Sequence, residues 1–194
     1  MTYKKLVDDY FSAVIDTLRR IDVNELVRLI NAIESAVSNG KSIYVMGNGG
    51  SSSTASHIKS DLGNTVYQLK GKSINVHCLS DNVATITAIA NDYSYDLIYV
   101  RQLQGRINPG DLVIAISGSG NSKNIINAVL YAKSVKANVA AMTGYGGGAI
   151  KEFADINLNV PVDNMQISED IHLLFNHVMT HVLNFSDIDF RRDC

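Results

Sequence analysis

Apolar residues near the N-terminus recur with the spacing of amphipathic helices. The first series predicts a helix over residues 3–20 and comprises Phe11, Val14, Ile15 and Leu18. The second ends at the stop signal Asn39-Gly40 and comprises Leu26, Ile30, Ile33 and Val37. Because both helices precede the first strand signal, their apolar faces could cover a sheet or pair with another subunit.

The pattern changes at residue 41 to short apolar runs separated by longer helical stretches. The runs with the character of buried strands are Ser42–Met46, Ile74–Leu79, Leu112–Ile116, Val139–Met142 and Ile156–Val160. This alternation indicates an α/β fold, in which crossover helices cover both faces of a parallel sheet. A last helix is predicted over 168–185, and residues 186–194 form a polar tail. We therefore expect a single domain over 1–194, with its core at about 3–185.

The composition is compatible with such a domain. A chain of 194 residues fits one domain, and 46% hydrophobic residues are enough for a sizeable core. A formal net charge of −2 gives no electrostatic reason to expect nucleic acid or anionic lipid as a partner. No apolar stretch approaches the ~18 residues of a membrane span, and Met1–Asp9 lacks the apolar segment of a secretion signal. We therefore expect a cytoplasmic protein.

Two segments rich in glycine and serine, Gly47–Ser53 and Ser117–Ser122, each join a predicted strand to a predicted helix. Ligands of parallel sheets bind at such strand ends, where helix N-termini present free backbone N–H groups. Glycine permits close backbone approach, and hydroxyl groups add hydrogen-bond donors. The expected anion-binding residues are Asn48, Gly49, Gly50, Ser51, Ser117, Gly118, Ser119 and Ser122. Turns of this composition also occur without a ligand, but two of them at strand ends favour an anion site.

The chemistry of these loops narrows the class of anion. Neither loop has the Gly-Lys-Ser/Thr ending of a P-loop, and neither has the third glycine of a dinucleotide-binding loop. No Lys or Arg lies inside either loop. A neutral cradle of this kind suits a phosphate monoester better than a nucleoside triphosphate with magnesium, and it disfavours a nucleotide-dependent oxidoreductase.

An ordered set of motifs extends the pattern over nearly the whole chain. It comprises Gly-Asn-Gly-Gly-Ser at 47–51, His57, Ala90-Asn91-Asp92, Ile116–Ser122, Thr143-Gly144, Glu169-Asp170-Ile171-His172 and His177. Through these motifs the sequence resembles the sugar isomerase (SIS) domain family over roughly residues 3–184. Within that family it looks most like the phosphoheptose isomerases, which act on sedoheptulose 7-phosphate.

The resemblance implies a five-stranded parallel sheet flanked by helices, with the N-terminal helices used for subunit packing. It implies a homotetramer with active sites at subunit interfaces and a metal, usually zinc, in each site. Ser51, Ser117, Ser119 and Ser122 would hold the phosphate. The implied reaction converts sedoheptulose 7-phosphate to D-glycero-D-manno-heptose 7-phosphate by metal-assisted proton transfer between C1 and C2.

The matching positions for the metal ligands of the family are His57, Asp61, Glu169 and His177. The resemblance makes Asp61 and His177 the acid/base pair, and Glu169 also a substrate contact. Asp61 stands where the family has Glu, so its carboxylate would sit roughly 1 Å or more further back. Glu169 stands where the family has Gln and adds a negative charge. Since eight helical residues rise about 12 Å, either the last helix begins after Glu169 or the ligands come from different subunits.

Other interpretations stay open at this stage. Asn91 and Asp92 follow the predicted helix Ala84–Ala90 and would either orient substrate or simply end the helix. Tyr145-Gly146-Gly147-Gly148 is interpreted as a flexible connection. The alternative to an isomerase is a non-catalytic SIS protein, either a phosphosugar sensor or an adaptor that binds another protein such as a replication initiator. Such a protein needs only the serine loops, so the four candidate ligands favour an enzyme.

Overall fold

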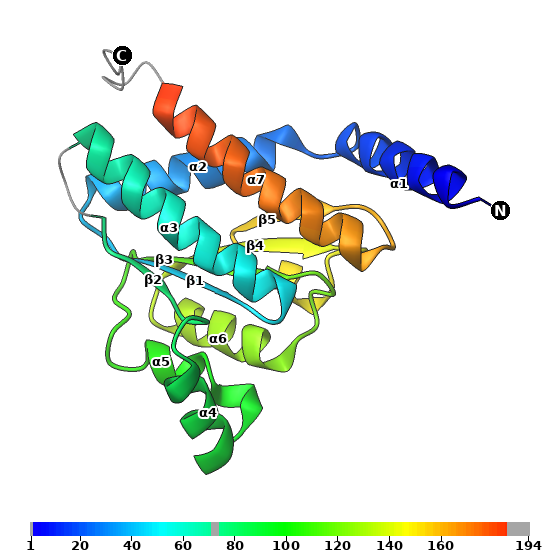
Figure 1. The fold of residues 1–194 in the computed structure, drawn as a ribbon. Coiled ribbons are helices and arrows are strands. Elements are labelled where there is room, and N and C mark those ends of the chain that lie inside the picture. Colours follow the sequence, from blue (N-terminus) through cyan, green and yellow to red (C-terminus); the bar gives the residue numbers. More distant parts are fainter. Residues whose placement is uncertain (1, 71–73, 186–194) are drawn as a thin grey trace.

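The computed structural model describes residues 2–70 and 74–185, and within them a parallel sheet lies between two layers of helices (Figure 1). The strand order is β2-β1-β3-β4-β5. The strands are β1 (Ile43–Gly47), β2 (Val76–Cys78), β3 (Leu112–Ser117), β4 (Asn138–Gly144) and β5 (Ile156–Val160). All neighbouring strands pair in parallel register, so the predicted five-stranded α/β fold is confirmed.

Successive residues of the central strands point to opposite faces of the sheet and contribute to two separate cores. Ile43 and Val45 of β1 belong to the core on one face, and Tyr44 and Met46 belong to the core on the other. Every residue of β1 and β3 is buried, which explains why these strands are continuous apolar runs in the sequence. The edge strand β5 instead alternates between buried and half-buried residues.

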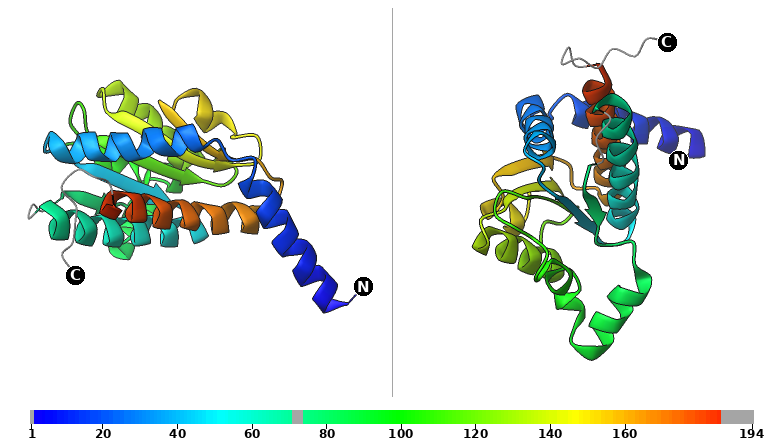
Figure 2. Two further views of the ribbon diagram at one scale, coloured as in Figure 1. Left: turned by 90° about the horizontal axis from the view of Figure 1, so that it is seen from above. Right: turned by 90° about the vertical axis from the view of Figure 1, so that its left-hand side faces the viewer.

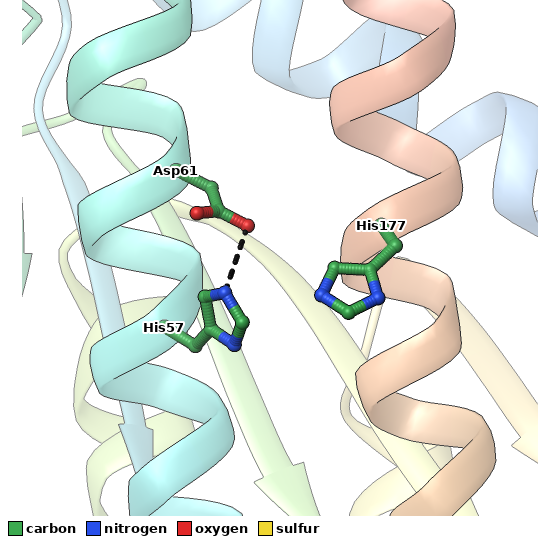
Figure 3. A group of neighbouring side chains, drawn as sticks. All are labelled: His57, Asp61 and His177. Carbon is green, nitrogen blue, oxygen red and sulfur yellow. Dashed lines mark ion pairs between the residues drawn. The ribbon is translucent and has the colours of Figure 1, made fainter.

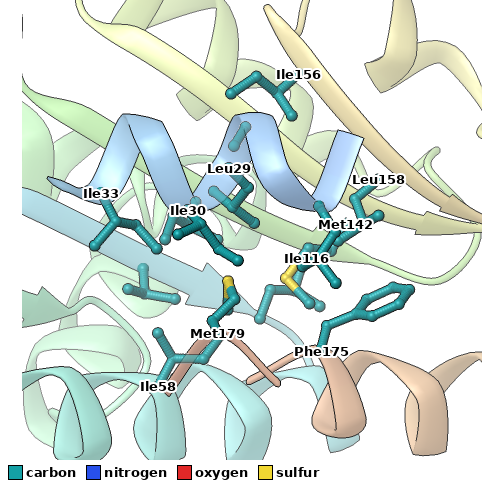
Figure 4. Close-up of a cluster of buried hydrophobic side chains, with 14 of the residues drawn as sticks. Leu29, Ile30, Ile33, Ile58, Ile116, Met142, Ile156, Leu158, Phe175 and Met179 are labelled. Carbon is teal, nitrogen blue, oxygen red and sulfur yellow. The ribbon is translucent and has the colours of Figure 1, made fainter. Parts of the chain in front are cut away.

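The two faces are covered by different helices. α2 (Val23–Ser38), α3 (Gly50–Lys70) and α7 (Met165–Phe185) pack over one face, where their apolar side chains meet those of the strands (Figure 4). The other face is covered by α5 (Val100–Leu103) and α6 (Lys123–Ser134), with α4 (Val83–Asp92) beside them. Two short 3₁₀ helices also occur, at Tyr95–Leu97 and at Ala149–Glu152. The second connects β4 to β5, where the other strands are joined by α-helices.

Of the two predicted N-terminal helices, α2 covers the sheet and α1 (Tyr3–Leu18) projects from the body of the molecule (Figure 2). The large apolar side chains that α1 leaves exposed are Tyr3, Leu6, Val7, Phe11 and Ile15. Near its middle, the Tyr10 hydroxyl donates to Asp170 Oδ2 of α7 at 2.5 Å. The C-terminal half of α1 packs against the core through Val14 and Leu18, whereas the apolar side chains nearer its N-terminus are not covered within the single chain.

Several predicted boundaries shift in the structure. α3 begins at Gly50, so Ser51–Ser53 lie in its first turn and not in a loop. α7 begins at Met165, three residues before the predicted start. The predicted polar tail, 186–194, lies outside the described residues. Among the helices that the structure describes, none combines the length and the apolar character needed to cross a membrane.

His172 joins α7 to the sheet. Its side chain is completely buried, and its Nε2 lies 3.0 Å from the carbonyl oxygen of Thr143 near the end of β4. Because a carbonyl oxygen only accepts hydrogen bonds, Nε2 carries the proton and Nδ1 is the unprotonated nitrogen. Burial lowers the pKa of His172 to about 4, so the folded protein keeps this imidazole neutral.

We predict that His172 makes the protein sensitive to acid. Between the ordinary histidine pKa of 6.5 and the folded value of about 4, the unfolded chain binds a proton that the folded chain does not. The free energy of unfolding therefore falls as the pH falls through this window, by up to about 3 kcal/mol. His172→Gln keeps an N–H donor but does not titrate, so urea unfolding should show a smaller loss of stability between pH 6.5 and pH 4.5. Equal losses in the two proteins would contradict the prediction.

Candidate functional site

The two predicted anion-binding segments lie side by side, because β1 and β3 are paired neighbours and end at the same edge of the sheet. Asn48 and Asn124 join the segments through reciprocal amide hydrogen bonds of 3.0 and 2.9 Å. The hydroxyls of Tyr95 and Tyr99 lie 3.0 and 3.1 Å from Asn48 Oδ1. The Asn48 side chain, expected to contact the anion, is thus engaged in holding the two segments together. Sequence reasoning missed Asn124 and Tyr99, which contact Asn48 only through the fold.

The serines of the cradle occupy the starts of two helices. Ser51 is the second residue of α3, whose first N–H groups have no partner inside the helix. Ser117 is buried at the end of β3, and its hydroxyl donates to Ser122 Oγ at 3.4 Å. Ser122 is the N-cap residue of α6, yet its side chain makes no capping hydrogen bond. Two helix N-termini and several hydroxyls therefore meet at one edge of the sheet, where they favour a bound anion.

The segment Tyr145–Gly148 packs against the second anion-binding loop, and with Gly144 and Ile150 on either side it forms a brace for that loop. The interpretation as a flexible connection did not include this contact. The Ile150 N–H donates to the Gly120 carbonyl at 3.0 Å, and the Gly144 N–H donates to the Gly118 carbonyl at 2.8 Å. Gly120 has a φ of +66°, and a Cβ added to it would overlap the carbonyl oxygen of Gly147. The glycines of both segments thus allow two backbones to pack directly against each other.

A potential metal-binding group lies between α3 and α7, further along α3 than the serines of the cradle. His57 and Asp61 project from α3 toward His177 on α7 (Figure 3). His57 Nε2 lies 3.3 Å from Asp61 Oδ2, and the ring centroids of the two histidines are 5.1 Å apart. One ligand atom from each of the three residues lies within 4.8 Å of the others. Since α3 and α7 pack along one another, residues 116 positions apart along the chain meet here.

The donor set of this group fits zinc. Two imidazole nitrogens and a carboxylate oxygen are ligands that Zn²⁺ takes, and catalytic zinc sites use three protein ligands and an open position. The His57 and Asp61 side chains are 42% and 23% exposed, so an ion held there would remain accessible to a small molecule.

Glu169 lies outside this group of three, although it was expected to be a fourth ligand. Because α7 begins at Met165, Glu169 is inside the helix and about 12 Å of helical rise from His177, which excludes a helix that starts after it. Its carboxylate instead lies against Gly50, where an added Cβ would be 2.5 Å from Glu169 Oε2. A carboxylate is stabilised at this position by the N-terminus of α3. A role for Glu169 as a zinc ligand stays a prediction.

Asn91 and Asp92 occupy the last turn of α4 and not the segment after it. Both are exposed, and the Asn91 amide donates to Asp92 Oδ1 at 2.9 Å. This position is compatible with a helix-terminating role, and their contact with substrate stays a prediction.

A family model and individual relatives of known name both connect this chain with the same family of proteins. A family model described as the SIS domain matches residues 9–144. A probable phosphoheptose isomerase of Thermoplasma acidophilum is 37% identical over 164 residues, which cover 84% of this chain and 90% of that protein. A phosphoheptose isomerase of Sulfurimonas denitrificans is 36% identical over 187 residues, covering 93% of this chain and 94% of that protein.

Solved structures agree with the sequence relatives. A phosphoheptose isomerase from Francisella tularensis superposes with a TM-score of 0.86 at 31% identity, covering 95% of this chain and 99% of that one. Phosphoheptose isomerase GmhA from Neisseria gonorrhoeae gives the same TM-score at 29% identity, covering 94% and 99%. The Vibrio vulnificus NanR protein, solved with ManNAc-6P, has a TM-score of 0.65 at 19% identity and shares the fold.

We predict that Gly120→Ala disrupts the second anion-binding loop. The substitution puts a Cβ against the Gly147 carbonyl and strains a left-handed backbone, so it should lower the free energy of unfolding by about 2 kcal/mol or more. Gly146→Ala in the same region is the matched control, because a Cβ there meets nothing within 4 Å. Urea unfolding and calorimetric titration with phosphosugar would measure both effects. Equal stability and affinity in the two variants would refute the role of the brace.

Proposed function

The chain belongs to the SIS domain family, and from this membership we propose that it is a phosphosugar isomerase. Its proposed reaction interconverts sedoheptulose 7-phosphate and D-glycero-D-manno-heptose 7-phosphate. The observation that carries the proposal is the convergence of His57, Asp61 and His177 beside the hydroxyl-lined cradle. A protein that only binds a phosphosugar has no need of such a group.

The phosphate of the substrate would be held at the two helix N-termini. In this proposal Ser51, Ser117, Ser119 and Ser122 donate hydrogen bonds to the phosphate oxygens, assisted by the backbone of Gly49, Gly50 and Gly118. His57 lies six residues beyond Ser51, a helical rise of about 9 Å. An extended sugar anchored by its phosphate would thus direct its opposite end, which carries C1 and C2, toward His57 and Asp61.

The proton transfers can be assigned to residues of this chain. Asp61 removes a proton from C1 of the open-chain ketose while His177 gives a proton to the carbonyl oxygen on C2, which yields a neutral enediol. His177 then takes the proton from the C1 hydroxyl as Asp61 returns a proton to C2, and the C1 aldehyde forms. Both residues end the cycle in the protonation state in which they began.

Zinc is the proposed cofactor, one ion in each active site. His57, Asp61 and His177 would hold it, and Glu169, the predicted fourth ligand, would come from a neighbouring subunit because it is about 12 Å of helical rise from His177 in the same chain. When bound, zinc would polarise the substrate carbonyl and the neighbouring hydroxyl, which makes the C1 proton more acidic. Because Glu169 lies over Gly50, beside Ser51, we also propose that it contacts the sugar between the phosphate and the reacting carbons.

We further propose that the protein assembles into a homotetramer with active sites at subunit interfaces. The apolar face of α1 supports this proposal, since Phe11 is 61% and Val7 50% exposed in the single chain. Apolar surface of this kind favours association with a second copy. In such an assembly the exposed Asn91 and Asp92 would contact a substrate bound either in their own subunit or in a neighbouring one.

The reaction has a direct test. Zinc-loaded protein incubated with sedoheptulose 7-phosphate in deuterated water should incorporate deuterium at C1 and C2 and produce the aldose, as followed by proton NMR. Asp61→Asn should lower the exchange rate by at least about a hundredfold, because the amide is not a base. If wild-type protein neither exchanges these protons nor forms the aldose, the proposed reaction is wrong.

Metal content separates an isomerase from a sensor or adaptor. Purified protein should contain stoichiometric zinc by elemental analysis, and His177→Ala should lose most of it because one of three clustered ligands is removed. The variant should still bind phosphosugar through the serines. Wild-type protein that contains no zinc as purified, takes up none when zinc is added and still binds phosphosugar would instead support the non-catalytic alternative.

A further inference from the structure

Asn176 makes a hydrogen bond from inside the protein to the proposed base. It directly precedes His177 on α7 and has no exposed surface, yet its Nδ2 donates to Asp61 Oδ2 at 2.7 Å. This bond connects two helices whose residues are 115 positions apart in the chain. Asp61 is therefore held from two sides, by its own helix and by the neighbouring one.

The Asn176 amide is poorly suited to a purely structural role. Its Oδ1 is buried, and no hydrogen-bond partner for it occurs among the described residues. A buried acceptor without a partner destabilises a protein, and an apolar side chain of the same size would remove that cost. The group that this amide contributes is its N–H, and the acceptor of that N–H is Asp61.

The bond from Asn176 and the contact with His57 involve the same carboxylate oxygen of Asp61. Asp61 Oδ2 accepts from Asn176 and faces His57 Nε2 at 3.3 Å, as Figure 3 shows for the histidine. Within the described residues Oδ1 has no such contact. A carboxylate oxygen that accepts from a buried donor is restricted in position, so Asp61 Oδ2 is kept beside His57 in the space between α3 and α7 (Figure 3).

We propose that Asn176 is a positioning residue that orients the Asp61 carboxylate for zinc binding and for proton transfer. The catalytic half of this inference rests on the proposed isomerase function, and the zinc half does not. A fixed direction matters more for Asp61 than for a longer side chain, because a short aspartate has little freedom to reach a misplaced substrate or ion. The buried amide supplies that orientation at the expense of its own unpaired oxygen.

The test replaces the amide with an apolar side chain of similar size. Asn176→Leu should lower kcat and weaken zinc binding by about ten- to hundredfold, as expected when the partner of a metal ligand is lost. KM should stay within about twofold, because the phosphate cradle is untouched. Zinc affinity is measured by competition with a chromogenic chelator, and the folded state is checked by thermal unfolding.

Thr180→Val is the matched control. Thr180 lies one turn further along α7, and its buried hydroxyl makes no hydrogen bond to Asp61 or to any other described residue. This variant should keep wild-type kcat and zinc affinity. If Asn176→Leu does not fold, Asn176→Ala removes the same donor without added bulk and takes its place.

The outcomes separate the two proposals. The positioning role is overturned if the Asn176 variant keeps wild-type kcat and zinc affinity, or if its changes are no larger than those of Thr180→Val. The isomerase activity of the wild-type protein is not affected by that outcome. If the wild-type protein has no isomerase activity, the proposed function fails. The zinc affinities of the same variants then decide the role of Asn176 alone.

Discussion

The packing of α3 against α7 is the interaction on which the candidate site depends. Both helices begin at the edge of the sheet where the parallel strands end, and they run side by side in the same direction (Figures 1 and 2). Successive turns of α3 therefore lie beside successive turns of α7, counted from the sheet edge where both helices begin. Glu169 meets Gly50 near the start of both helices, and the His57, Asp61 and His177 side chains meet further along. The candidate anion site lies at the start of this helix pair, and the candidate metal site lies further along it.

Much of this arrangement could be predicted from the sequence because it follows from local patterns. Buried parallel strands require continuous apolar runs, and helices that cover a sheet require an apolar stripe, so their order was visible in the chain. The rule that ligands bind where parallel strands end gave the expected position of the anion site, and the structure brings the two segments together at that edge. Ser51–Ser53 were misplaced by one turn because serine and glycine are compatible with both a loop and a helix start.

The remaining features could not be predicted because they depend on contacts between distant residues. Asn124 and Tyr99 reach Asn48 only after β1, β3 and the helices between them have packed. Nothing in the spacing of Tyr145–Gly148 shows that its backbone lies against Gly120. The separation of Glu169 from His177 did follow from helical rise, but its place over Gly50 required the structure.

The two departures from the family pattern have different structural settings. Asp61 is surrounded by partners, since an amide from α7 and an imidazole from α3 both lie at its Oδ2. Glu169 has the N-terminus of α3 beside it, which compensates its added charge. Each of the two carboxylates thus has neighbouring groups that complement its charge.

The direct contact between the backbones at Gly120 and Gly148 has a consequence for affinity. Loops without side chains at their contact point have no rotamers to exchange, and the hydrogen bonds between them hold the second loop in its shape before any ligand arrives. The two anion-binding segments contain no lysine or arginine of their own, although Lys151 lines the pocket beside Ser119 and Asn121. Preorganisation of the loop would add to its affinity, since donors that already point at an anion lose little entropy when it binds.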